Sequence, residues 1–244
     1  MRAHAPGRVN LIGDHTDYAG GLALPMAIDL GTTVEGVRTG RTVELVSDLE
    51  PLPARVQLDV ADPAAVDPPW ARYVAGVVAE LRPEIGLSGR VRSTLPVGAG
   101  LSSSAALELS VALALGFTGD PLELARLGQR AEHRASGVPC GLMDQLTVAC
   151  GVEGHALLVD FAATAVTPVP VPADAEVVVV HSGEPRALAG SAYAERRSQV
   201  DAAIAALGPL RDRPVTDLDQ LDDPVLRRRA RHVLSENARV RDTA

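Results

Sequence analysis

The order of apolar and polar residues along this chain predicts a sheet covered by helices. Apolar runs and alternations typical of strands fall in the first part of the chain, at residues 8–12, 28–37, 42–46 and 89–95. Apolar residues at helical spacing predict helices over 70–81, 101–117 and 120–136, the last with Asp120 as its N-cap. A glycine-rich connection follows at 137–145. A mixture of this kind favours an α+β fold.

The second part of the chain predicts further strands and then helices. Strand-type runs occupy 155–161 and 176–182, and helices are expected from about Leu188 to Leu207 and after Pro224. Proline and aspartate crowd the stretch 48–69, which is typical of a loop or an irregular edge. A weak change of composition near 168–174 predicts two domains, at residues 1–172 and 173–244.

Composition and charge narrow the class of protein. The 244 residues are 46% hydrophobic, enough for a core, and contain no uncharged apolar run of the roughly 18–20 residues that a membrane helix needs. No signal-like segment begins the chain, so a cytoplasmic location is expected. The net charge of −8 argues against nucleic acid as a partner, and the basic run at 227–232 is interpreted as a solvated helix face. Cys140 and Cys150 are given no redox role.

All 23 basic residues are arginine, and this limits how the chain can bind nucleotides. A Walker-type loop needs a lysine on the phosphates, so it is excluded. The stretch LPVGAGLSSSAALE, residues 95–108, offers another kind of cradle. Gly98 and Gly100 permit a tight turn, and the helix that follows presents free N–H groups and three serine hydroxyls. A serine-capped helix without a ligand is the alternative interpretation.

Four other polar positions carry candidate chemistry, each with a plainer alternative. The stretch GRVNLIGDHTDYAGG, residues 7–21, places an arginine, two acids and a histidine beside a predicted strand. Asp144 follows a turn rich in glycine and is aimed at a cleft or caps a helix. Glu132 is a ligand or an exposed acid paired with Arg130 or Arg134. Tyr193 uses its hydroxyl on a ligand or buries its ring.

Taken together, these stretches resemble the galactokinases of the galacto-, homoserine, mevalonate and phosphomevalonate (GHMP) kinase superfamily. GRVNLIGDHTDYAGGLALPMAI is similar to the family's sugar-binding signature, LPVGAGLSSSAALE to its phosphate-binding loop, and AEHRASGVPCGLMDQ to the stretch with its catalytic aspartate. The resemblance covers essentially the whole chain. It implies a two-domain α+β fold, with an N-terminal domain like domain 2 of ribosomal protein S5 and an incomplete C-terminal α+β domain.

The resemblance also implies an activity, ATP-dependent phosphorylation of the anomeric hydroxyl of galactose, with ATP and Mg²⁺ as cofactors. The expected partners are the sugar and ATP, with no nucleic acid and no membrane. By motif position, Asp144 and Arg8 are the catalytic pair. The positions that match sugar-binding residues are Asp14, His15, Asp17, Gly141 and Tyr193. The positions that match nucleotide-binding residues are Gly98, Ala99, Gly100, Leu101, Ser102, Ser103, Ser104 and, near the adenine, Trp70. Ser104 and Glu132 match the magnesium ligands.

Two departures from the family pattern keep alternatives open. The family usually has glutamate where this sequence has Asp14, so a related kinase for arabinose, a uronic acid or an N-acetylhexosamine is an alternative. The sequence given stops at Ala244 without the family's third glycine-rich motif, so a protein that binds sugar and ATP without turnover is another. Without the family's remaining part, the C-terminal domain is expected to have an incomplete sheet with open edges. Oligomeric state does not follow from the sequence.

Overall fold

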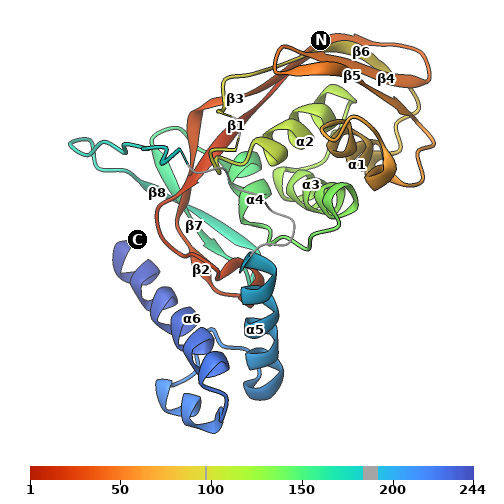
Figure 1. Ribbon diagram of the computed structural model, residues 1–244. Coiled ribbons are helices and arrows are strands. Elements are labelled where there is room, and N and C mark those ends of the chain that lie inside the picture. The colour runs from red at the N-terminus through yellow and green to blue at the C-terminus, as the bar shows by residue number, and fades with distance from the viewer. Residues whose placement is uncertain (97, 184–191) are drawn as a thin grey trace.

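The computed structural model describes residues 1–96, 98–183 and 192–244, which form an α+β fold (Figure 1). Its larger sheet has five strands in the described part of the chain, in the order β1-β3-β6-β4-β5. Their bounds are β1 Arg2–Asn10, β3 Pro25–Arg38, β6 Leu87–Ser93, β4 Thr42–Ser47 and β5 Glu50–Gln57. Neighbours pair antiparallel except β4 and β6, which run parallel.

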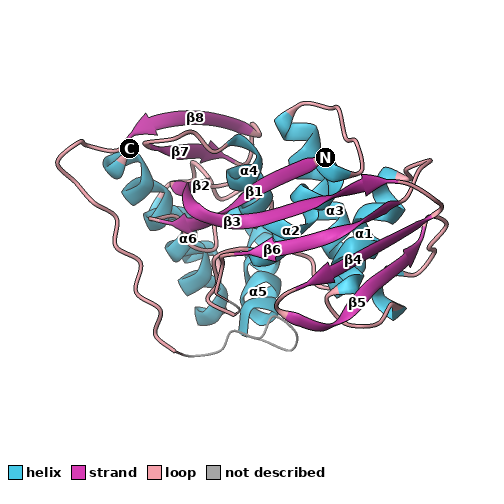
Figure 2. Cartoon of the chain, turned by 90° about the horizontal axis from the view of Figure 1, so that it is seen from above, coloured by secondary structure: helices cyan, strands magenta, loops and turns pink. Residues whose placement is uncertain are grey.

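Four helices cover one face of this sheet (Figure 2). They are α1 Ala71–Leu81, α2 Ser103–Ala114, α3 Pro121–Ser136 and α4 Met143–Cys150. Helix α2 packs on β1 and β3, while α1 and α3 pack on each other and α4 on α3. The largest apolar core lies between sheet and helices, with Val34, Leu45, Leu87 and Leu109 almost fully buried. Burial of such side chains contributes about 1.5–3 kcal/mol each and holds the layers together.

A smaller sheet and a pair of helices complete the described fold. The sheet has the order β2-β7-β8, with β2 Leu22–Ala23, β7 His155–Asp160 and β8 Ala165–Pro170. The helices α5 Ala192–Leu207 and α6 Pro224–Thr243 pack on each other and share a separate core with η3 Val215–Gln220. Two further short 3-10 helices are η1 Asp17–Ala19 and η2 Pro63–Ala65. Ala19 of η1 belongs to the core of α5 and α6, so the first and last parts of the chain are packed together.

Several predicted elements are confirmed. Helix α1 follows Trp70, and α3 begins after Asp120, whose carboxylate accepts from the Glu123 amide while the Glu123 carboxylate accepts from the Asp120 amide. This capping box satisfies two N–H groups that a helix start otherwise leaves open. The helix expected from about Leu188 is described from Ala192 onward, and residues 188–191 lie outside the described part.

One prediction of secondary structure is confirmed in part, and two are wrong. The stretch 48–69 contains β5, an edge strand that bonds to β4 alone, which agrees with the irregular edge expected there and explains why its prolines are tolerated. The connection 137–145 ends in the first turn of α4, a helix that the glycines in this stretch concealed. Residues 176–182 form no strand, and Val178 and Val180 are 74% and 83% exposed, because no neighbouring strand pairs with this segment among the described residues.

Other features of the sequence fare differently. Arg228 and Arg231 of the basic run are exposed on α6, as expected for a solvated face, although Ala230 between them is buried. Within the described residues, no helix is both long enough and apolar enough to cross a membrane. The domain boundary near residue 172 stays a prediction.

Candidate active site

The glycine-rich loop before α2 takes a tight, strained course. Gly98 and Gly100 have φ values of +73° and +75°, which glycine adopts without steric cost. Ser102 has φ +58° and, although it stands at the N-cap of α2, makes no capping bond. The interpretation of this stretch as a simple serine-capped helix is therefore wrong. The Arg8 amide donates to the Leu101 carbonyl at 3.1 Å, which ties the loop to β1.

Arg8 and Asp144 form an ion pair at the centre of the site. The Arg8 guanidinium donates from Nε and Nη2 to Asp144 Oδ1, at 2.8 and 2.6 Å, and from Nη1 to the Gly100 carbonyl at 2.7 Å. Asp144 Oδ2 accepts from the Ser102 hydroxyl at 2.5 Å. The Arg8 side chain is 9% exposed and that of Asp144 31%, so the carboxylate keeps an open side. Asp144 lies in the first turn of α4, yet its carboxylate serves this cluster.

Glu132 is buried beside the loop, not exposed. Its carboxylate accepts from Ser104 Oγ at 2.9 Å and from Gln145 Nε2 at 2.6 Å. Arg130 and Arg134 instead pair with Glu80, so the alternative of a surface ion pair at Glu132 is wrong. Burial raises the pKa of Glu132, and the nearby Asp144 adds to the shift. Two acids thus lie near each other here, and a bound cation would stabilise their negative charge.

A second group of side chains comes from the turn between β1 and β2. His15 has φ +62°, and its Nδ1 lies 2.8 Å from Tyr18 Oη. The Tyr193 ring contacts both, tilted against His15 with ring centroids 5.6 Å apart and edge-on to Tyr18 with centroids 5.7 Å apart. Burial raises the pKa of Tyr193, and Asp17 adds to that shift, so its hydroxyl stays protonated. Tyr193 lines the cleft, so its position is compatible with the predicted contact to a ligand.

Asp17 and Gly141 approach each other closely. A Cβ at Gly141 would lie 1.6 Å from Asp17 Oδ2, so any other residue there would force the Asp17 carboxylate to move. Burial raises the pKa of Asp17 to about 6, and the Asp144 carboxylate adds to the shift. Asp14 differs, because it is exposed and its carboxylate accepts from Asn10 Nδ2 at 2.9 Å. The Asp14 side chain thus lies at the rim of the cleft, where aspartate fits in place of the longer glutamate that the family usually has.

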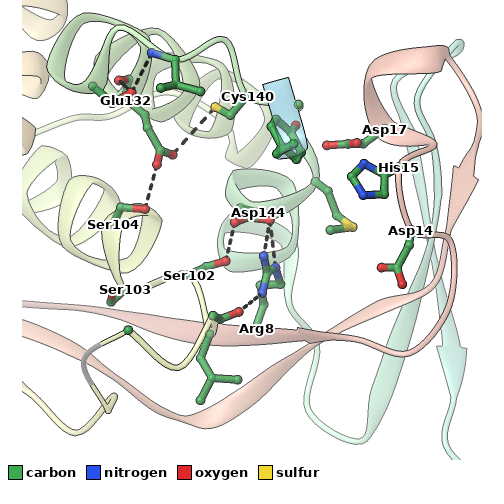
Figure 3. Close-up of a pocket in the computed structure, with 18 residues that line it drawn as sticks. Arg8, Asp14, His15, Asp17, Ser102, Ser103, Ser104, Glu132, Cys140 and Asp144 are labelled. Carbon is green, nitrogen blue, oxygen red and sulfur yellow. Dashed lines mark hydrogen bonds and ion pairs between the residues drawn. The ribbon is translucent and has the colours of Figure 1, made fainter. Parts of the chain in front are cut away.

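These groups meet in one cleft of about 220 Å³ (Figure 3). Asp14, His15 and Asp17 lie on one side and Ser104 and Glu132 on the other, with the pair of Arg8 and Asp144 between them. The sequence-predicted residues that line this cleft are Arg8, Asp14, His15, Asp17, Gly98, Gly100, Leu101, Ser102, Ser103, Ser104, Glu132, Gly141, Asp144 and Tyr193.

Two predicted residues do not face this cleft. Ala99 lines a different cavity near Met26 and Val177. Trp70 is 8% exposed, belongs to the main core, and donates from its indole nitrogen to the Leu52 carbonyl at 2.9 Å. It also lines a neighbouring cavity of about 240 Å³, together with Tyr73 and the two serines Ser103 and Ser104. Since both serines line the cleft as well, the two cavities meet at the start of α2.

Sequence reasoning missed several polar groups that support the site. Gln145 is fully buried and bonds to Glu132, and a signal was available because it directly follows Asp144. Glu108 is fully buried on α2, and burial, with Glu132 beside it, raises its pKa well above the ordinary range. Cys140 also lines the cleft, and burial raises the pKa of its thiol, so it remains protonated. None of these stood out from composition alone.

Two family models match the chain in the regions that build the cleft. Residues 1–37 match the galactokinase galactose-binding signature, and residues 72–152 match the N-terminal domain of GHMP kinases. The mevalonate kinase of Methanococcus jannaschii shares the fold at 18% identity, with a TM-score of 0.58 over 98% of this chain and 79% of that one. Fold and site thus define a GHMP-type kinase, and the predicted fold class is confirmed.

Closer relatives specify the family. The galactokinase of Thermococcus kodakarensis is 41% identical over 98% of this chain and 70% of its own length, and that of Chloroflexus aurantiacus 41% over 97% and 65%. The structure of Lactococcus lactis galactokinase complexed with galactose superimposes with a TM-score of 0.87 at 30% identity, over 99% of this chain and 68% of that one. The chain belongs to the galactokinase family. It spans about two thirds of the length of these relatives.

Proposed function

We propose that this chain carries the sugar and ATP sites of a kinase that transfers the γ-phosphoryl group of ATP to the C1 hydroxyl of galactose. The observation that carries the proposal is the pair of Arg8 and Asp144, 2.6 Å apart, between a glycine-rich loop and a turn with two further carboxylates. Family membership supports the same activity, since the relatives named above are galactokinases.

The chemistry follows from the positions of these groups. The C1 hydroxyl gives its proton to the Asp144 carboxylate, its oxygen forms a bond to the γ-phosphorus, and the bond from that phosphorus to the bridging oxygen breaks to release ADP. Asp144 Oδ2, now bonded to Ser102, is the oxygen that faces away from Arg8. Arg8 keeps N–H groups on Nη1 and Nη2 that stabilise charge on the transferring group.

The turn with Asp14, His15 and Asp17 binds the sugar and selects between epimers. Carboxylates accept from sugar hydroxyls, and a sugar with a hydroxyl in the wrong place leaves a buried acceptor unpaired, which costs about 1–3 kcal/mol. Asp17 is the stronger candidate for this role because it lies deeper, against Gly141, whereas Asp14 is at the rim. The Tyr193 hydroxyl and the backbone of Gly141 complete the proposed sugar pocket.

The start of α2 receives the triphosphate, with the adenine directed to the cavity beside Trp70 and Tyr73. Four carboxylates, Asp14, Asp17, Glu132 and Asp144, line the cleft against the guanidinium of Arg8. A triphosphate beside this many acids needs a cation, and Mg²⁺ is commonly held by one or two protein oxygens plus phosphates. Ser104 and Glu132 supply such oxygens, and the bound ion would neutralise phosphate charge. The described residues contain no larger cluster suited to a metal.

An ADP-release assay across a sugar panel tests this function. Galactose, arabinose, galacturonic acid and N-acetylgalactosamine are offered at equal concentration with ATP and Mg²⁺, and product is identified as the 1-phosphate by NMR. We expect galactose to give the highest kcat/KM. A higher value for another sugar contradicts the substrate assignment, and calorimetric galactose binding without any phosphorylated product points to binding without turnover.

A further inference from the structure

Helix α6 packs against β2, the strand at which the turn with the proposed sugar-binding residues ends (Figure 1). Three polar side chains of α6, at positions i, i+4 and i+5, point to the turn: His232, Glu236 and Asn237. His232 and Glu236, four residues apart, lie on the same side of the helix, and Asn237 directly follows Glu236. None of the three lines the cleft, so any effect they have on the sugar is indirect.

The backbone of Asp14 is held by α6 at both ends. Glu236 Oε1 accepts from the amides of Gly13 and Asp14, at 2.9 and 3.2 Å, and His232 Nε2 donates to the Asp14 carbonyl at 2.8 Å. The Leu22 amide, at the far end of the turn, donates to Asn237 Oδ1 at 2.9 Å. Both ends of the turn are therefore bonded to the same helix.

The fit between the turn and α6 is tight. A Cβ at Gly21 would lie 2.5 Å from Asn237 Oδ1, and one at Gly13 would lie 2.4 Å from the Ala23 backbone. The turn also bonds within itself, because the Thr16 hydroxyl bridges the Gly13 and Leu22 carbonyls at 2.8 and 2.7 Å. A turn that is closed on itself and bonded to a helix has little freedom to change where its side chains point.

Glu236 is the central member of this contact. It is 7% exposed, and its second oxygen is paired with Arg239, so the carboxylate is satisfied on both sides. Burial works against its charge, but the bonds from Arg239, Gly13 and Asp14 outweigh that effect and lower its pKa. A buried acid at a core position of an amphipathic helix is costly without such partners. Here the partners are the two amides of the sugar-binding turn.

We propose that Glu236 is a positioning residue for sugar recognition, which fixes the turn of Asp14, His15 and Asp17 through the Gly13 and Asp14 amides without touching the sugar. His232 and Asn237 complete the same support. The inference rests on the proposed function, in which this turn binds galactose. It adds that sugar affinity and the preference for galactose over its epimer glucose are set in part from a helix more than 200 residues away in the sequence.

The test compares Glu236→Ala and Glu236→Gln with Arg231→Ala, a matched control on the exposed side of the same helix. Two quantities are measured in the full chain: amide hydrogen exchange of Gly13 and Asp14 by NMR, and calorimetric affinity for galactose and for glucose. Glu236→Ala is expected to speed exchange of these two amides by about tenfold or more and to weaken galactose binding by about tenfold. The ratio of galactose to glucose affinity is expected to fall, which a general loss of stability does not produce.

Glu236→Gln keeps an oxygen acceptor for the amides and should stay within about threefold of the wild type. Unchanged exchange at Gly13 and Asp14 in Glu236→Ala overturns the inference, as does wild-type galactose affinity and selectivity in that variant. If the wild type does not bind galactose, the proposed function fails, while the exchange rates still decide whether Glu236 fixes the turn.

A variant that fails to fold does not block the test. Should Glu236→Ala be unfolded by circular dichroism at the assay temperature, His232→Ala replaces it, because its bond to the Asp14 carbonyl is at the surface and less costly to lose. Weaker galactose binding and a lower galactose-to-glucose ratio in His232→Ala support the proposal. Values equal to those of Arg231→Ala contradict it.

Discussion

The phosphate side of the cleft and its sugar side are supported in different ways. On the phosphate side, the bonds of Ser104 to Glu132 and of Ser102 to Asp144 join residues 28 and 42 positions apart. On the sugar side, the turn at Asp14 depends on Glu236 and His232, which are 222 and 218 positions away. The phosphate side thus combines helices from one stretch of the chain with Arg8 of β1, while the sugar side is held between the first and last parts of the described chain.

This difference has a consequence for how each side responds to change. The phosphate side is anchored by two buried charged residues, Arg8 and Glu132. The sugar side rests on hydrogen bonds to a helix pair with its own smaller core. We therefore expect substitutions on the phosphate side to affect transfer more than binding, and those on the sugar side to affect binding and selectivity first.

The largest effect is expected at the catalytic pair. Asp144→Ala removes the proton acceptor and leaves Arg8 without its partner, so kcat should fall by about 10²–10⁴-fold. Galactose binding, measured by calorimetry, should change by no more than about threefold, because Asp144 faces one hydroxyl of the sugar. Asp222→Ala, at an exposed site far from the cleft, serves as the control. Turnover close to that of the wild type in Asp144→Ala contradicts the role given to this acid.

The next effect is expected where the two sides meet, at Gly141. A Cβ there collides with Asp17 Oδ2, and since this atom is the end of a side chain, Asp17 swings aside while the fold remains. Gly141→Ala should weaken galactose binding by about 10–100-fold, with little change in melting temperature.

Gly137→Ala is the matched control in the same connection. It has φ +69° and open space around its Cβ position, so it tests backbone strain alone. If both variants bind galactose equally well, the contact of Gly141 with Asp17 is not a determinant of the pocket.

A smaller effect is expected from pH, through Asp17. Because burial and Asp144 raise its pKa from 3.8 to about 6, the folded protein holds this proton more tightly than the unfolded chain does. The free energy of unfolding should therefore fall by about 2 kcal/mol as pH rises from about 4 to about 6. Galactose affinity should rise over the upper part of this window, since the charged carboxylate is the better acceptor.

Urea unfolding and calorimetry between pH 4 and 8 measure both trends. Asp17→Asn keeps the shape of the side chain and cannot titrate, so its stability and affinity profiles should be flatter than those of the wild type. If the unfolding free energy of Asp17→Asn changes with pH as steeply as that of the wild type, groups other than Asp17 cause the pH dependence.

The smallest effect concerns stability on the phosphate side alone. Asp120→Ala breaks the capping box of α3, which carries Glu132, and should lower the free energy of unfolding by about 1 kcal/mol. Galactose affinity should not change, because α3 starts about three helical turns before Glu132 and the main core holds the helix in place. If Asp120→Ala changes galactose affinity without lowering the free energy of unfolding, the prediction that this cap affects stability alone is wrong.

The sequence by itself determined the local elements and the motifs of the site. Helical spacing and Asp120 placed α3, and the glycines and serines of residues 98–104 predicted a loop that opens a helix. The family resemblance, carried by three continuous stretches, predicted most of the residues that line the cleft, and family membership is confirmed. These features lie in short segments, where spacing and side-chain chemistry are visible directly.

Only the tertiary structure decided which partner each polar group has. The sequence is compatible with Glu132 as a surface acid paired with Arg130 or Arg134. In the structure α1 packs on α3, and both arginines pair with Glu80 of α1. Glu132 bonds instead to Ser104 and Gln145. In the same way, 176–182 has the pattern of a strand but no neighbour to pair with among the described residues. A hydrogen bond depends on what lies across space, and long-range contacts such as that of Glu236 with the sugar-binding turn leave no mark in local spacing.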